Sequence, residues 1–161
     1  MRDKLTDAIR VGKVSSIDPV KCTAQVTFED RDGIVSGDLP IMVRFTLEDM
    51  EYGMPAIGER VRVLFDPEAP SKGCILGSYY ADTRLPPITG ESKRYIRFSD
   101  GAHLEYDKRT HALTVNIPPS GTITFAVGGT SMTITSGGIA INGNISQSGT
   151  HTDIIGSHCS C

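Results

Sequence analysis

Residues 110–152 read THALTVNIPPSGTITFAVGGTSMTITSGGIAINGNISQSGTHT and contain no Lys, Arg, Asp or Glu. Within this stretch apolar residues occupy alternate positions in short bursts: Leu113, Val115, Ile117, Ile123, Phe125, Val127, Met132, Ile134, Ile139 and Ile141. Turn-forming residues separate the bursts, at Pro118–Gly121, Gly128–Gly129, Gly137–Gly138 and Gly143–Asn144. A period of two between such breakers predicts serial short strands, each with one apolar face.

Nothing in this stretch supplies a cover for the apolar faces. Strands this short bury too little surface to form a core alone, and no helical pattern follows them. Bare, uncharged strand edges would also promote aggregation. The pattern therefore favours self-association of three copies into a β-helix, with apolar residues on a common axis and hydroxyls outside. The bursts shorten toward the C-terminus, which predicts a taper to a pointed tip.

The composition limits the classes of protein to consider. A chain of 161 residues allows one domain or two small ones, and a net charge of −3 disfavours nucleic acid as a partner. No apolar run approaches about 18 residues, and no signal peptide is recognisable, so we expect synthesis in the cytoplasm and no ordinary secretion. Four cysteines do not make a disulfide scaffold at this length. Cys22 and Cys74 are expected to be buried thiols in strands.

The first half of the chain predicts a small barrel. Polar turns and one irregular loop, over 45–56, separate five expected strands at 11–18, 23–29, 35–44, 57–65 and 73–79. In the fourth of these, Val61, Val63 and Phe65 share one face. Five such strands fit an OB-type Greek-key barrel. The expected all-β organisation is an N-terminal tail (1–10), an OB-fold barrel (11–85), a linker and neck (86–109) and a trimeric β-helix spike with its tip (110–161).

Several short motifs, taken in order, resemble the baseplate assembly protein V family of contractile phage tails. The resemblance covers nearly the whole chain and ends in the charge-free stretch. The motifs are Gly12-Lys13-Val14, Ile17-Asp18-Pro19, Leu39-Pro40, Met54–Glu59 before Val61–Phe65, Gly73–Tyr80, Pro86-Pro87 and Phe98–Gly101 before Leu104–Tyr106.

The resemblance implies a structural role and no enzymatic activity. Members form the homotrimeric central spike of the tail baseplate, with an OB-fold ring on the baseplate hub protein and a triple-stranded β-helix directed at the target cell. Sheath contraction drives the spike through the bacterial outer membrane, so the expected location is the virion tail, acting at the target cell envelope. A shaft without charges suits passage through a bilayer. R-type bacteriocins and other contractile injection particles share this plan, and the resemblance does not separate them from phages.

The resemblance also implies a metal-binding tip, where a His-x-His pair from each chain surrounds an iron ion on the threefold axis. This chain has no His-x-His, a departure from the family pattern. His158 stands in the place of one ligand, but Ser160 follows it at the second position. His151 with Asp153 offers nitrogen and oxygen donors for iron, and Cys159 with Cys161 offers thiolates for zinc or iron. Alternatively, His151 is a surface residue, and the cysteines are free thiols or disulfides between chains.

Other functions fit the sequence less well. His103 and His111 lie near several acidic residues, but strand alternation is expected to place them on different faces as surface histidines. The acidic turn 29–32 lacks the spacing of a calcium loop. One alternative is an OB-fold binding module for oligosaccharide or single-stranded nucleic acid, although few aromatic residues and no obvious basic groove support it. Another alternative is a receptor-binding fibre that recognises a surface sugar.

Overall fold

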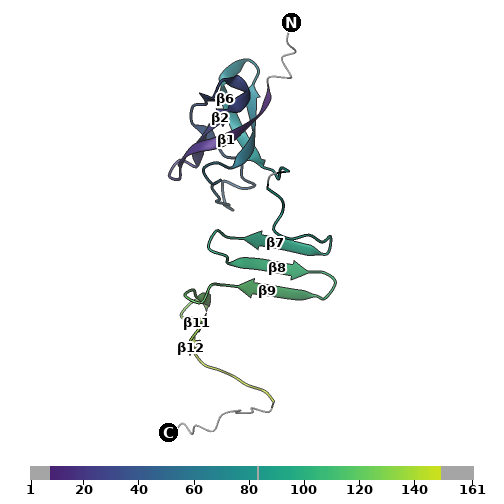
Figure 1. Ribbon diagram of the computed structural model, residues 1–161. Helices are drawn as coiled ribbons and strands as arrows, with labels where there is room; N and C mark the ends of the chain where they lie inside the picture. The colour runs from purple at the N-terminus through teal and green to yellow at the C-terminus, as the bar shows by residue number, and fades with distance from the viewer. Residues whose placement is uncertain (1–7, 83, 150–161) are drawn as a thin grey trace. The chain divides into compact units, whose positions relative to one another are not determined.

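The computed structural model describes residues 8–82 and 84–149 (Figure 1). The chain is all-β with antiparallel sheets, as predicted, and the only helical element in the described part is the 3-10 turn η1 (Glu29–Arg31). None of the described residues forms a helix with the length and hydropathy needed to span a bilayer. The chain divides into two compact units, of which the first ends at Pro87 and the second begins at Ile88.

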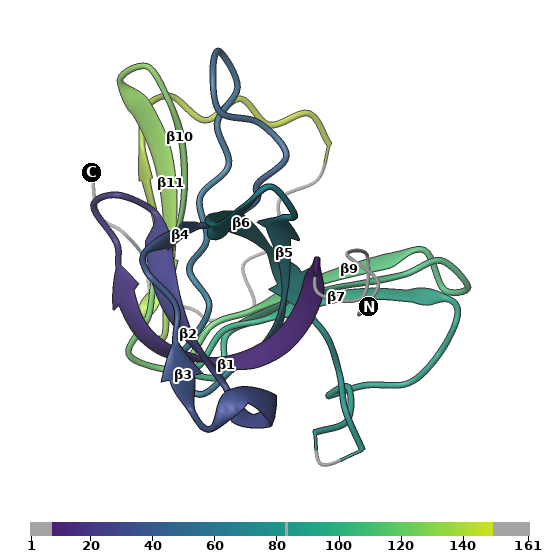
Figure 2. The same ribbon diagram turned by 90° about the horizontal axis from the view of Figure 1, so that it is seen from above.

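The first unit is a twisted sheet whose two ends meet. Its strands are β1 (Ile9–Asp18), β2 (Thr23–Phe28), β3 (Ile34–Val35), β4 (Leu39–Pro40), β5 (Arg60–Asp66) and β6 (Ala69–Ser78). The order is β3-β2-β1-β5-β6, and β4 also pairs with β2. Just after β4, Ile41 forms a parallel bridge with Ile75 of β6, and the Met42 amide donates to the Ile75 carbonyl at 2.9 Å. The strands therefore run in a circuit that returns through β4 to β2 (Figure 2).

Several strand boundaries in this unit differ from the prediction. β1 begins at Ile9 rather than residue 11, within the expected tail, and β5 spans Arg60–Asp66 rather than 57–65. The third strand was expected over 35–44 but consists of β3 and β4, joined through Ser36, whose backbone amide and hydroxyl both pair with Val26 of β2. β6 begins at Ala69 rather than residue 73, because Ala69 pairs with Asp66 across a tight turn. The loop expected over 45–56 carries no strand, apart from an isolated bridge between Thr46 and Met50.

A single apolar cluster fills the inside of the strand circuit. Every second residue of β5 is buried, as the alternation predicted, and these side chains meet those of the neighbouring strands. The cluster consists of Val14, Ala24, Val26, Phe28, Leu39, Val61, Val63, Phe65 and Ile75. Gly12 is required where β1 approaches β2, because an added Cβ would contact the Val26 side chain and lie 2.7 Å from the Thr27 carbonyl oxygen. Cys22 and Cys74 are free thiols, but they are half-buried rather than fully buried.

The second unit consists of two three-stranded meanders. One contains β7 (Lys93–Arg97), β8 (His103–Asp107) and β9 (Ala112–Asn116), and the other contains β10 (Ile123–Val127), β11 (Thr130–Thr135) and β12 (Gly138–Asn142). The alternating bursts of the charge-free stretch thus form strands, as predicted. Strands β8 and β9 pair with each other along their whole length. The expected boundary between neck and spike at 109/110 falls in the turn between these two strands.

Candidate functional site

The β10–β12 meander has one apolar face. Its registers align Ile123 with Ile134 and Ile139 in one row, and Phe125 with Met132 and Ile141 in the next. Because side chains alternate between the two faces of a sheet, these rows share a face. The opposite face carries small and polar residues, in the rows Thr124–Thr133–Ala140 and Ala126–Ser131–Asn142.

This apolar face is open to solvent in the single chain. Phe125 is 56% exposed and Ile139 is 66% exposed, and Met132 and Ile134 on the central strand are only half-buried. Contiguous exposed apolar surface of this kind marks an interaction site. Covering it would favour association by roughly 25 cal/mol for each Å² of apolar surface removed from water.

The β7–β9 meander has the same two-faced construction. Ile96, Leu104 and Val115 form a row across its three strands, and Tyr106 opposes Leu113 beside them. All five of these side chains are exposed in the single chain. Each of the two sheets of the second unit therefore has an apolar face that is open to solvent in the single chain.

The other face of β7–β9 is polar and internally paired. The Lys93 ammonium donates to the Glu105 carboxylate at 2.6 Å, and this hydrogen bond raises the pKa of Lys93. The rings of Tyr95 and His103 lie 5.3 Å apart, and His103 Nδ1 is 3.3 Å from the Gly101 carbonyl oxygen. His111 lies in the β8–β9 turn with a φ of 55°. His103 is therefore a strand residue with a ring neighbour and a backbone contact, and His111 is a turn residue.

Asp107 should make the β8–β9 turn sensitive to acid. Its carboxylate accepts a hydrogen bond from the Arg109 amide at 2.8 Å, and this bond is the main reason that the Asp107 pKa lies below that of an ordinary aspartate. Because the folded pKa lies below the unfolded one, the stabilisation is complete above the unfolded pKa and is lost as the pH falls through the folded value. We expect an NMR titration to show Asp107 protonating at lower pH than an ordinary aspartate, with reduced protection of the Arg109 amide from exchange in the same range. In Asp107→Asn this acid-dependent loss of protection should disappear, and a midpoint no lower than that of an ordinary aspartate in the unsubstituted protein would contradict the prediction.

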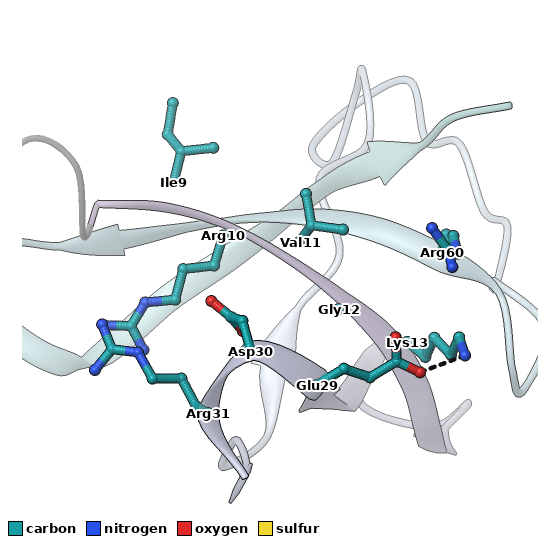
Figure 3. Close-up of a pocket in the computed structure, with 9 residues that line it drawn as sticks. All are labelled: Ile9, Arg10, Val11, Gly12, Lys13, Glu29, Asp30, Arg31 and Arg60. Atoms are coloured by element: carbon teal, nitrogen blue, oxygen red, sulfur yellow. Dashed lines mark hydrogen bonds and ion pairs between the residues drawn. The ribbon is translucent and has the colours of Figure 1, made fainter. Parts of the chain in front are cut away.

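A pocket that sequence reasoning missed lies on the first unit (Figure 3). Its volume is about 350 Å³, and residues 9–13 of β1, η1 and Arg60 line it. Four lining side chains are basic and two are acidic. Glu29 accepts a hydrogen bond from Lys13, which lowers the Glu29 pKa. Glu29 of the acidic turn 29–32 is therefore paired with β1.

The predicted metal ligands His151, Asp153, His158, Cys159 and Cys161 lie outside the described residues. Within residues 8–82 and 84–149, no three His, Cys, Asp or Glu side chains group where they could hold a metal ion.

A comparison with protein-family models and with curated proteins found no match for this chain.

Proposed function

We propose that this protein is the central spike of a contractile-tail baseplate and works as a homotrimer that pierces the target cell's outer membrane. The observation that carries the proposal is the open apolar face of β10–β12 in a segment without charges. A single copy leaves Phe125, Ile139 and Ile141 in water. Three copies placed around an axis would cover these side chains and leave the Thr and Ser rows outside.

Strand pairing supports the same assembly. Strands β10 and β12 each have one neighbour within the chain, so each leaves one edge without a ladder partner among the described residues. Open edges of this kind pair readily with other chains. In a triple-stranded β-helix the neighbouring copies would satisfy them, and the resulting shaft would resist axial load. The role is mechanical, and the proposal includes no enzymatic step.

The first unit fits the barrel part of the proposal. We interpret it as an OB-type barrel, in which β3 and β4 together act as the third strand and β6 closes the circuit beside that strand. The parallel bridge between Ile41 and Ile75 supports this interpretation. In the proposed spike this barrel joins the baseplate hub protein.

An ion at the tip would hold three C-termini together where the load is greatest. Imidazole and carboxylate from His151 and Asp153 suit iron, whereas thiolates from Cys159 and Cys161 suit zinc or iron, with His158 beside them. The ion would act as a structural cross-link, since metal binding adds to the free energy of folding. Two paired variants separate the donor sets, namely Cys159→Ser with Cys161→Ser, and His151→Ala with Asp153→Ala.

Mass measurement in solution combined with elemental analysis tests the proposal. We expect a particle of three times the 17.3 kDa chain mass, with one iron or zinc ion for three chains. The ion should be lost in the paired variant that removes its ligands and retained in the other. A compact single copy would overturn the spike proposal. Retention of labelled single-stranded nucleic acid on filters at moderate salt would favour the binding-module alternative, and loss of adsorption after masking one surface sugar would favour a receptor-binding fibre.

A further inference from the structure

The loop between β4 and β5 presents an apolar and acidic tip. Phe45, Leu47 and Met50 are 56%, 86% and 79% exposed, and the acidic residues Glu48 and Asp49 lie between the last two. Exposed apolar side chains of this size, gathered on one loop, indicate a surface that another molecule covers.

The tip has a defined shape. Arg44 binds the Glu51 carboxylate with two hydrogen bonds of 3.1 Å, from Nε and from Nη2. The Glu51 amide donates to the Phe45 carbonyl at 3.1 Å, and Thr46 bridges to Met50. These contacts join the two arms of the loop at its base. A loop ordered in advance loses less conformational entropy when it binds.

The pocket of Figure 3 complements this tip in polarity and in charge. Ile9 and Val11, two residues apart on β1, give it apolar surface that is 51% and 42% exposed. Its basic side chains exceed its acidic ones by two, whereas in the loop over 44–51 the acidic side chains exceed Arg44 by two. Complementary charge of this kind fixes which surfaces meet and in what orientation.

The two surfaces lie on different sides of the first unit, so one chain cannot fill its own pocket. Figure 2 shows the β4–β5 loop extending on the side away from β1 and β3. A contact between two different patches of identical chains is heterologous, and it makes a ring when the rotation closes. We propose that the β4–β5 loop of one copy docks into the β1–η1 pocket of the next copy. This inference rests on the proposed trimer and names the surfaces through which its first units meet.

Zero-length cross-linking between two co-expressed full-length variants tests this contact. One variant carries Lys13→Arg and keeps the loop acids, and the other keeps Lys13 but carries Glu48→Gln and Asp49→Asn. A carbodiimide link from Lys13 to Glu48 or Asp49 can then form only between different chains. We expect mass spectrometry to find this link. The link from Lys13 to Glu29, which pair within one chain, serves as the internal control.

Removal of one positive charge from the pocket should weaken the contact. Arg60→Gln, which adds no carboxylate beside Lys13, is introduced into the chain that keeps Lys13 and should lower the yield of the interchain link severalfold. Arg97→Gln, the same change at an exposed arginine of the second unit, should leave the yield unchanged. A trimer that yields only the Lys13–Glu29 link overturns this inference and leaves the spike proposal standing. A single-copy mass would overturn both.

Discussion

Replacing Met132 by Asp should leave the chain unable to form a trimer. Met132 lies on the central strand β11, between Phe125 and Ile141 in one row of the apolar face. In the proposed assembly this substitution would bring three carboxylates into an apolar interior close to the axis. An unpaired buried charge costs several kcal/mol, and mutual repulsion adds to that cost. Sedimentation equilibrium should therefore show a single-copy mass, or aggregation through the exposed face, in place of the trimer.

Thr133→Asp is the matched control, because Thr133 is the next residue on the same strand and points to the opposite face. It introduces the same charge into the same sheet, so it tests the face rather than the tolerance of β11 for aspartate. We expect this variant to remain trimeric. A trimer that survives Met132→Asp would show that the apolar face is not the interface. Loss of the trimer in both variants would indicate that β11 simply tolerates no charge, and the face would then need testing with Met132→Ser.

The sequence predicted the faces of the strands better than their partners. Alternation places Val61, Val63 and Phe65 on one buried face and Phe125 and Val127 on one open face, because side-chain direction has a period of two. The period of two does not show which strand pairs with which. The charge-free stretch was expected to begin the spike at Thr110, yet its first strand β9 pairs with β8 across a turn that follows Asp107 and contains His111.

The third strand of the first unit shows a second limit of pattern reasoning. The run from Val35 to Arg44 looked continuous, but Ser36 continues the pairing with Val26 through its own side chain, and Pro40 ends β4. After Pro40 the backbone pairing passes to β6, because the Ile41 amide still donates to the Cys22 carbonyl and the Met42 amide donates to the Ile75 carbonyl. The alternation of apolar and polar residues does not reveal that the Ser36 hydroxyl accepts the Val26 amide in place of a backbone carbonyl.

The pocket could not have been found from the sequence, because Arg10, Glu29 and Arg60 come from three separate segments that only the sheet brings together. The shape of the β4–β5 loop was equally hidden, since the Arg44–Glu51 pair joins residues seven apart in an irregular segment. The composition of the loop did carry a signal, because it combines large apolar residues with acids where a turn would be polar.

Ile75→Ala should destabilise the first unit by about 2–5 kcal/mol, the range for truncating a fully buried aliphatic side chain. Ile75 is 1% exposed in the apolar cluster, and its backbone holds the bridge that closes the strand circuit. The substitution would therefore leave a cavity beside the bridge that joins β6 to Ile41 at the end of β4. Hydrogen exchange read by mass spectrometry should show faster exchange in β6 and at Met42.

Leu64→Ala removes the same number of carbon atoms from the neighbouring strand, but Leu64 is 38% exposed, so its loss of stability should be clearly smaller. If both variants lost the same free energy of unfolding, Ile75 would not be packed in the apolar cluster inside the strand circuit. Because the open apolar face belongs to the second unit, Ile75→Ala should still give the trimer mass. Weakening of the first unit with retention of the trimer would place the source of assembly in β10–β12, whereas loss of the trimer would show that assembly depends on the barrel as well.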